Sequence, residues 1–242
     1  SMIASSIYIL NDIFDIEEDR KHPEKKDRPL ASGAISIRTA IILALIMVLS
    51  GTTIAYLLSK TLLLLFLIYI IMNILYTIKL KHIAIIDIFI IAIGFILRLF
   101  YCSAVTNIYL SHWIIIMTFL LALFLGLAKR RDDRLIFNET EQTTRKVIHG
   151  YTLEFLNIAM SMMATIVIVA YIMYTASAEV IKHTGTDKIY ITTIWVIFGI
   201  LRYLQITLVE NKSGSPTKIL LKDRVIQFCI LAWLTTFGVF LY

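Results

Sequence analysis

Long apolar runs separated by short polar segments dominate this sequence. Seven runs are long enough to cross the hydrocarbon core of a bilayer as helices. They lie at residues 37–58, 61–78, 83–105, 112–128, 152–174, 189–209 and 225–242. An eighth apolar stretch, at residues 2–10, covers only about 14 Å as a helix and is too short to span alone. The pattern predicts an all-α protein, a polytopic transmembrane helical bundle.

The composition agrees with this prediction. The chain has 242 residues, of which 59% are hydrophobic and 17% charged, whereas soluble domains are near half apolar and a quarter charged. Cys102 and Cys229 lie far apart in apolar runs, so neither a zinc site nor a disulfide framework is expected. Because no Gly/Ser-rich linker interrupts the chain, we expect a single integral-membrane domain over residues 1–242.

The positions of the basic residues predict an orientation. If each long run crosses the membrane once, one side carries the polar segments around 20–36, 79–82, 129–150 and 210–224. The other side carries the segments around 59, 106–111 and 175–188. Nearly all loop Lys and Arg lie in the first group, and only Lys60, Lys182 and Lys188 lie in the second. Because short basic loops stay in the cytoplasm, we expect a multi-pass protein of the cytoplasmic (inner) membrane whose first group of loops faces the cytoplasm.

An acidic motif follows the short apolar stretch at the amino end. Asp12, Asp15 and Asp19 lie at positions i, i+3 and i+7, which on a helix places three carboxylates on one side within about two turns. Like charges this close destabilise a helix unless a cation balances them. Mg²⁺ prefers oxygen ligands and shares them with substrate phosphates, and Asn11 adds a neutral oxygen. The motif therefore predicts a Mg²⁺–diphosphate site, with a solvated acidic helix end as the alternative.

A basic cluster, K-R-R-D-D-R at residues 129–134, ends the fourth long run. Most such clusters are only positive-inside anchors at the end of a span. The functional alternative is a phosphate clamp, in which Lys129 acts as a point charge and Arg130 as a bidentate fork. Asp133 lies four residues after Lys129 and is spaced to orient it. Both interpretations stay open from the residues alone.

Two ionisable residues lie inside the third long run. Asp87 and Arg98 are close to three helical turns apart, so they share a face, but about 16 Å separates them along the helix and they cannot pair. Ionisable groups inside a span are costly and usually face a cavity. Asp87 lies near the cytoplasmic boundary and is a candidate for the metal site or for holding a basic residue. Arg98 lies nearer the far side, where snorkelling or structural hydrogen bonding competes with a role in binding a lipid phosphate.

Three further residues lie on the same predicted side of the membrane as the acidic motif. Arg28 follows that motif, Tyr151 lies where the chain re-enters the membrane, and Arg202 lies about five residues inside the sixth run. Each is a candidate for substrate binding in combination with the two motifs.

Together these residues resemble the UbiA superfamily of intramembrane prenyltransferases. The stretch N-D-I-F-D-I-E-E-D at residues 11–19 matches the first motif of that superfamily, N-D-x-x-D-x-x-x-D, and R-P-L-A-S-G at residues 28–33 is similar to its basic follow-on. The resemblance implies nine helices around a central cavity that binds Mg²⁺-diphosphate. Because this chain has about eight apolar segments, we expect that the first helix and part of the second are missing from it.

The basic cluster departs from the pattern of aromatic prenyltransferases in this superfamily. They carry a second acidic motif, D-x-x-x-D, where this chain has G-L-A-K-R-R-D-D-R. Lys and Arg at this place are similar to the branch of decaprenyl-phosphate phosphoribosyltransferases. Further similarity to that branch runs through L-K-H, R-K-V-I-H-G-Y-T-L-E-F-L, L-R-Y and L-K-D-R-V-I-Q, so the resemblance covers nearly the whole chain.

The resemblance to this branch implies a phosphoribosyltransferase, an enzyme that moves phosphoribosyl from 5-phosphoribosyl diphosphate to a polyprenyl phosphate for cell-envelope glycan synthesis. The residues expected to bind Mg²⁺ and to act in catalysis are Asp12, Asp15 and Asp19. Lys129 and Arg130 are expected to hold the 5-phosphate, with Arg28 or Arg202 as helpers. The expected partners are the two substrates and the membrane, with no nucleic acid, and a homo-oligomer stays open.

Two other functions compete with this one. A UbiA-type prenyltransferase would move a prenyl group from prenyl diphosphate to an aromatic or other small acceptor. A transporter or lipid-binding membrane protein would bind a cation without turnover, but the internal repeats and broken helices frequent in transporters are not visible in the sequence. We therefore rank the phosphoribosyltransferase first and the prenyltransferase second.

Overall fold

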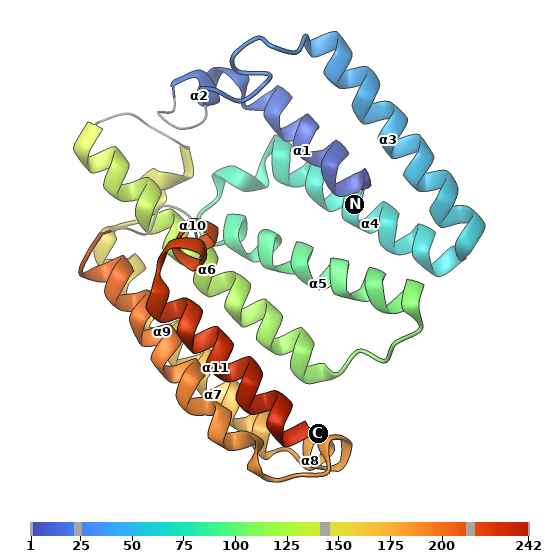
Figure 1. Cartoon of the computed structure of the whole chain (residues 1–242). Helices are drawn as coiled ribbons and strands as arrows, with labels where there is room; N and C mark the ends of the chain where they lie inside the picture. Colours follow the sequence, from blue (N-terminus) through green and yellow to red (C-terminus); the bar gives the residue numbers. More distant parts are fainter. Residues whose placement is uncertain (1, 22–25, 141–145, 212–215, 242) are drawn as a thin grey trace. The chain divides into compact units, whose positions relative to one another are not determined.

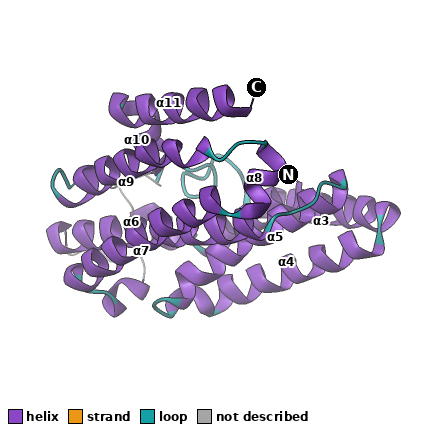
Figure 2. Cartoon of the chain, turned by 90° about the horizontal axis from the view of Figure 1, so that it is seen from below, coloured by secondary structure: helices purple, strands orange, loops and turns teal. Residues whose placement is uncertain are grey.

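The computed structural model describes residues 2–21, 26–140, 146–211 and 216–241 (Figure 1). Parts of three predicted cytoplasmic loops, at 22–25, 141–145 and 212–215, lie outside these ranges. All regular structure within the described ranges is helical, as Figure 2 shows. The helices are α1 (Met2–Phe14), α2 (Ile16–Lys21), α3 (Ile37–Leu58), α4 (Lys60–Ile78), η1 (Leu80–His82), α5 (Ile86–Thr106), α6 (His112–Thr140), η2 (Lys146–Gly150), α7 (Leu153–Ala176), α8 (Ala178–Thr184), η3 (Lys188–Thr192), α9 (Thr193–Leu208), α10 (Pro216–Lys222) and α11 (Arg224–Leu241). The prediction of an all-α protein is confirmed.

Seven segments among the described residues are long and apolar enough to cross a membrane, and they agree with the seven predicted runs. They are α3, α4, α5, α6, α7, η3 with α9, and α11. On these helices many large apolar side chains are exposed, among them Leu49, Leu57 and Leu231. Such outward apolar faces suit a lipid solvent, in which apolar side chains carry no exposure cost.

The fourth span is longer than its apolar run. α6 continues through the basic cluster and ends at Thr140, whereas the hydrophobic pattern ends near residue 128. Lys, Arg and Leu are good helix formers, and the segment has neither Gly nor Pro to stop the helix. An ion pair between Arg130 and Asp133, one turn apart, adds local support. The basic cluster is therefore presented on a rigid helix.

The packing of Cα atoms divides the chain into two compact units, and each is described by itself. The first unit contains Ser1–Leu110 and Ile136–Gly150, and the second contains Ser111–Leu135 and Tyr151–Tyr242. The expectation of one domain over residues 1–242 concerns how the two units combine, and it stays a prediction.

In the first unit, α1 packs along α3, and α4 packs against both α3 and α5 (Figure 1). One buried cluster contains Ala55, Leu62 and Phe66. The tight connection between α3 and α4 is a single residue, Ser59. Its N–H donates to the Ala55 carbonyl to end α3, and its hydroxyl accepts from the Thr61 N–H (3.2 Å) to begin α4.

In the second unit, α7 is the most buried span and α9 packs against both α7 and α11. The buried side chains of α7 include Leu156, Met160 and Ala164. α7 begins at Thr152, whose hydroxyl accepts from the Phe155 N–H (3.1 Å). This cap fixes where the chain turns from η2 into the span, immediately after Tyr151.

Candidate active site

The acidic motif lies at the junction of α1 and α2 in the first unit. The helical hydrogen-bond pattern continues across this junction, because the Asp15 N–H donates to the Asn11 carbonyl (2.9 Å) and the Asp19 N–H donates to the Asp15 carbonyl (2.7 Å). The i, i+3, i+7 spacing of the three aspartates is therefore presented on helical backbone, as the sequence predicts.

Arg28 bridges two of the three aspartates. Its Nη1 donates to Asp12 Oδ1 (2.6 Å) and to Asp19 Oδ2 (2.9 Å). The loop that carries Arg28 is fixed by Leu30, which is buried with Ile16 and Ala40. The positive charge on this nitrogen offsets the repulsion between the two carboxylates. Asp12 and Asp19 therefore form a pair that needs a cation between them.

The third aspartate of the motif pairs with a residue from elsewhere in the chain. Asp15 Oδ1 forms a salt bridge with Lys81 Nζ of η1. Asn11 Oδ1 accepts a hydrogen bond from the Thr77 hydroxyl at the end of α4. The α4–η1 corner therefore holds the motif from one side, and neither Thr77 nor Lys81 was among the residues proposed from the sequence.

Asp87 lies in the first turn of α5 and is completely buried. The residue two positions before it, Ile85, has a φ of +72°. A left-handed conformation is unusual for a β-branched residue and costs on the order of 1–3 kcal/mol. Such strain persists only where the surrounding contacts impose it, so the η1–α5 turn that carries Lys81 and Asp87 is a constrained part of the first unit.

The motif suits a hard cation in its chemistry. Within the described ranges, no three His, Cys, Asp or Glu side chains are close enough together to hold a metal ion. However, Asp12 and Asp19 offer only oxygen ligands, as Mg²⁺ prefers, and both already face a cationic group at Arg28 Nη1. A metal ion bound at this pair would replace or join that guanidinium. The donor set therefore fits Mg²⁺.

The basic cluster belongs to the second unit. Lys129 is exposed, whereas Arg130 and Asp133 are buried and form a salt bridge with each other. Asp133 thus pairs with Arg130, although its sequence spacing pointed to Lys129. The cluster combines an exposed ammonium with a guanidinium whose position a carboxylate fixes.

Arg131, which the sequence did not single out, is held by three hydrogen bonds. Its Nε donates to Asn157 Oδ1 (2.7 Å), its Nη1 to the Thr207 carbonyl (2.6 Å) and its Nη2 to Asn211 Oδ1 (2.8 Å). The side chain is 4% exposed. All three acceptors are neutral and come from α7, from α9 and from just after α9. Arg131 therefore connects α6 to α7 and α9 and fixes the position of the α6 segment that carries Lys129 and Arg130.

Arg202 is engaged by acidic residues of its own unit. It donates to Asp223 Oδ2 through Nη2 (2.7 Å) and to Glu210 Oε1 through Nη1 (2.9 Å). The hydrogen bond from Arg202 holds the pKa of the Asp223 carboxyl below its usual value. Asp223 also accepts from the Ile226 N–H (2.9 Å) and so begins α11. Arg202 thus connects α9 to the start of α11. A role of Arg202 in binding phosphate stays a prediction.

Tyr151 is 1% exposed, and its ring stacks on Phe155 with a centroid distance of 6.1 Å. It follows Gly150, where a Cβ atom would come within 2.9 Å of the Ala84 Cβ. This close approach packs η2 against the turn that precedes α5 in the first unit.

The pairings of Lys81 and Arg131 could not be found from the sequence, because each joins residues far apart in the chain.

Comparison with known proteins adds to this geometry. The model of the UbiA prenyltransferase family matches residues 1–212. The chain belongs to the UbiA prenyltransferase family. With its seven candidate spans, it is therefore a multi-pass integral membrane protein and a membrane transferase. The superfamily resemblance read from the acidic motif is confirmed.

Individual relatives and structures agree with this assignment. A decaprenyl-phosphate phosphoribosyltransferase of Mycolicibacterium smegmatis is 31% identical over the whole of this chain and 77% of its own length. One from Corynebacterium glutamicum is 29% identical over 95% of this chain and 70% of its own length. A UbiA homologue from Archaeoglobus fulgidus, solved with DMAPP and Mg²⁺, has the same fold, with a TM-score of 0.69 and 17% identity over 99% of this chain and 84% of its own.

Proposed function

We propose that this UbiA-family transferase moves a phosphoribosyl group from 5-phosphoribosyl diphosphate to a polyprenyl phosphate and releases diphosphate. The observation that carries the proposal is the similarity, over the whole chain, to decaprenyl-phosphate phosphoribosyltransferases. The basic cluster supports it, because a donor with a diphosphate at C1 and a phosphate at C5 needs two separate sites for anions. The acidic motif suits the first of these groups and the basic cluster suits the second.

The acidic motif would receive the diphosphate. Asp12 and Asp19 would hold Mg²⁺, which when bound neutralises charge on the leaving diphosphate. Asp15, which pairs with Lys81 in the structure, is the third ligand that the sequence predicts. The pair Asp12–Asp19 already accepts hydrogen bonds from Arg28. We expect Arg28 to pass from the carboxylates to a diphosphate oxygen as the substrate enters. Asn11, held by Thr77, would orient the same group.

The basic cluster would receive the 5-phosphate. Lys129 is the exposed cation and Arg130 is the buried one, fixed by Asp133. Arg131 anchors this part of α6 to two other helices. Binding of a phosphate would therefore require little rearrangement of the cluster. Preorganised charge of this kind is the main way in which a protein stabilises a transition state.

The reaction needs positioning more than acid–base chemistry. An oxygen of the lipid phosphate forms a bond to C1 of the ribosyl group, and the C1–O bond to the diphosphate breaks with its electron pair leaving on the diphosphate. The attacking phosphate is already anionic, so it requires no strong base. Orientation of the two substrates and stabilisation of charge would supply most of the rate. From the distribution of basic loops, we place the opening of this site on the cytoplasmic side.

The test uses purified protein in phospholipid nanodiscs with Mg²⁺. Diphosphate release is measured with 5-phosphoribosyl diphosphate and a polyprenyl phosphate, and separately with prenyl diphosphate and an aromatic acceptor. We expect release in the first pair only. Turnover of the second pair alone would replace the proposal with the aromatic prenyltransferase, and turnover of neither would refute both.

A matched pair of variants tests the acidic motif. Asp12→Asn removes one of the carboxylates that face Arg28 and should lower kcat by about 10²–10³. Glu17→Gln, in the same motif, changes an exposed carboxylate that pairs with Arg20 and should retain activity. Equal activity of the two variants would remove Asp12 from the mechanism.

A further inference from the structure

A second cationic group of the first unit lies inside a membrane span, away from the acidic motif. Arg98 on α5 is half-buried among aromatic side chains. Its Nη2 donates to the hydroxyl of Tyr69 (2.9 Å) on α4 and to that of Tyr8 (3.3 Å) on α1. Its Cζ lies 5.2 Å from the centroid of the Phe95 ring and 5.8 Å from that of the Tyr69 ring. Phenol hydroxyls and rings orient the guanidinium but carry no negative charge.

The charge of Arg98 is not balanced within its unit. No salt bridge joins it to a carboxylate among the described residues, and its buried Nε has no hydrogen-bond partner there. A guanidinium cannot lose its charge in a protein. A cation in an apolar span is costly unless an anion or water compensates it. The pairing of Arg98 is therefore incomplete in a way that an anionic ligand would complete.

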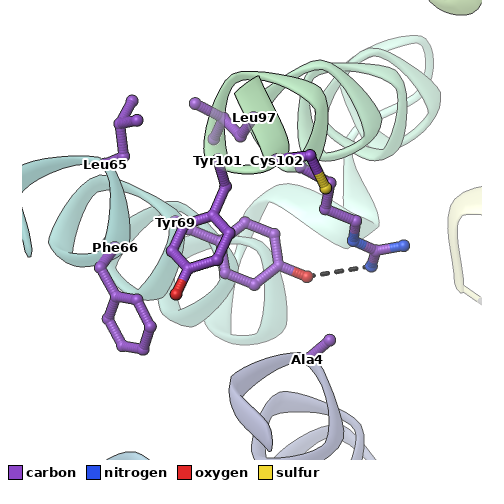
Figure 3. A pocket seen from close by; sticks show the side chains of 8 residues that line it. Ala4, Leu65, Phe66, Tyr69, Leu97, Tyr101 and Cys102 are labelled. Carbon is purple, nitrogen blue, oxygen red and sulfur yellow. Dashed lines mark hydrogen bonds between the residues drawn. The ribbon is translucent and has the colours of Figure 1, made fainter. Parts of the chain in front are cut away.

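A cavity of about 280 Å³ opens beside Arg98. Arg98 lines it together with Tyr69, to which it is hydrogen-bonded. Figure 3 shows the Tyr69 and Tyr101 rings close together, with Leu65, Phe66 and Leu97 around them. This volume is at the lower end for small-molecule sites. It suits a small anionic group together with the first part of one lipid chain, because the remaining wall is apolar.

Of the two hydroxyls that contact Arg98, that of Tyr69 belongs to the lining of the cavity and adds a donor to this site. Each phenol accepts a hydrogen bond from Arg98 Nη2, so its own O–H proton is directed elsewhere. Tyr69 and Arg98 both line the cavity, so the Tyr69 O–H and the Arg98 guanidinium offer donors to one anion there. A phosphate oxygen is the acceptor that such a charge-assisted set favours.

The cavity is distinct from the acidic motif. Arg98 is about 16 Å along α5 from Asp87, and Tyr69 is about 12 Å along α4 from Thr77, which contacts the motif. Arg98 lies near the middle of its span, whose ends are Ile86 and Thr106. A water-soluble anion has no apolar chain to match these walls, whereas a lipid phosphate carries one.

We propose that the cavity around Arg98 is a binding site for the phosphate headgroup of an anionic lipid, with the first part of one chain along Leu65, Phe66 and Leu97. The lipid is either a polyprenyl phosphate or an anionic phospholipid of the membrane, which share this chemistry. The site does not depend on the proposed phosphoribosyl transfer, and it binds its lipid without donor or Mg²⁺.

The chain carries its own reporter for this test. Cys102 lines the cavity and is exposed, whereas the second cysteine, Cys229, is buried. Protein in phosphatidylcholine nanodiscs, without donor or Mg²⁺, is treated with N-ethylmaleimide, and alkylation of Cys102 is followed by mass spectrometry. The added lipids are polyprenyl phosphate, phosphatidylglycerol and, as the uncharged control, polyprenol. Cys102→Ser gives the background rate.

We expect at least one phosphate lipid to slow alkylation of Cys102 and to remain bound in native mass spectra, while polyprenol has no effect. Which of the two protects identifies the source of the lipid. Arg98→Gln should raise the concentration needed for half-protection about tenfold or more, whereas Arg98→Lys, which keeps the charge, should retain most of the effect. Tyr69→Phe should weaken protection by a smaller factor, and it decides the question if Arg98→Gln does not fold.

Equal protection by polyprenol and polyprenyl phosphate would mean that the cavity binds chains alone, and it would overturn the proposal. Unchanged protection in folded Arg98→Gln, or no protection by either phosphate lipid, would also overturn it. Loss of diphosphate release in the separate assay would leave the lipid result unaffected, so the two proposals fail independently.

Discussion

Replacing Arg131 by methionine tests how the second unit is held together. Methionine retains much of the length and apolar contact of the side chain and removes the guanidinium. The substitution deletes three hydrogen bonds, to Asn157, Thr207 and Asn211, and leaves their oxygens without this donor. Arg131 is only 4% exposed, so water cannot readily take the place of the lost guanidinium in these three hydrogen bonds.

The magnitude follows from the number of bonds. A net contribution of about 1 kcal/mol for each bond gives a loss of about 3 kcal/mol in the free energy of unfolding. For a chain of this length, that loss corresponds to a fall of about 6–12 °C in Tm. The helices themselves should remain, because the substitution removes a connection between α6, α7 and α9 and no helix-forming contact.

The assay is thermal unfolding in detergent, followed as the fraction of monodisperse protein left after heating. Asn157→Ala alone should cost about 1 kcal/mol. The double variant should cost less than the sum of the two single variants, because both remove the same hydrogen bond. Asn211→Gly removes only the Oδ1 acceptor of Arg131 Nη2. Because Asn211 has a φ of +53°, a value that glycine adopts without strain, this variant tests that single hydrogen bond without a backbone penalty.

Two results would refute this reasoning. A Tm of Arg131→Met within about 1 °C of the wild-type value would mean that the three bonds contribute no net stability. Strict additivity of Arg131→Met and Asn157→Ala would mean that the two side chains do not interact in the membrane protein.

Two further predictions concern single contacts. Gly150→Ala places a Cβ atom 2.9 Å from the Ala84 Cβ and should destabilise the first unit by about 1–3 kcal/mol. Adding Ala84→Gly to this variant should restore its Tm. A wild-type Tm of Gly150→Ala alone would show that η2 does not approach this turn. The Arg202 contact lowers the pKa of Asp223 relative to the unfolded chain, so its stabilisation is present above the unfolded pKa, about 3.9, and is lost as the pH falls through the folded pKa. Asp223→Asn should therefore lower Tm near neutral pH and flatten the acid limb of the Tm–pH curve, and an unchanged acid limb would contradict the assignment.

Much of this fold could be predicted from the sequence because it depends on local properties. The length of an apolar run decides whether a helix can cross a bilayer, so seven spans were predicted and seven candidate spans are found among the described residues. The acidic motif was also visible, since the spacing of Asp12, Asp15 and Asp19 is a property of one helix. The end of α6 was not, because the hydrophobic pattern stops near residue 128 while helix propensity continues through the basic cluster.

The partners of the charged residues required the tertiary structure. Asp15 pairs with Lys81 across 66 residues, and Arg131 meets Asn211 across 80. No spacing rule covers such distances, because the return path of the chain decides which side chains meet. Arg202 illustrates the same limit: its sequence position suggested a phosphate ligand, and the fold surrounds it with Asp223 and Glu210.

The sequence by itself thus determined the membrane class, the helical spans and the acidic motif of this protein, since each follows from residues close together in the chain. Only the tertiary structure decided which cations are already neutralised and which, like Arg98, still lack a counter-charge among the described residues. The reason is that charge compensation depends on distances in space, which the packing of helices sets.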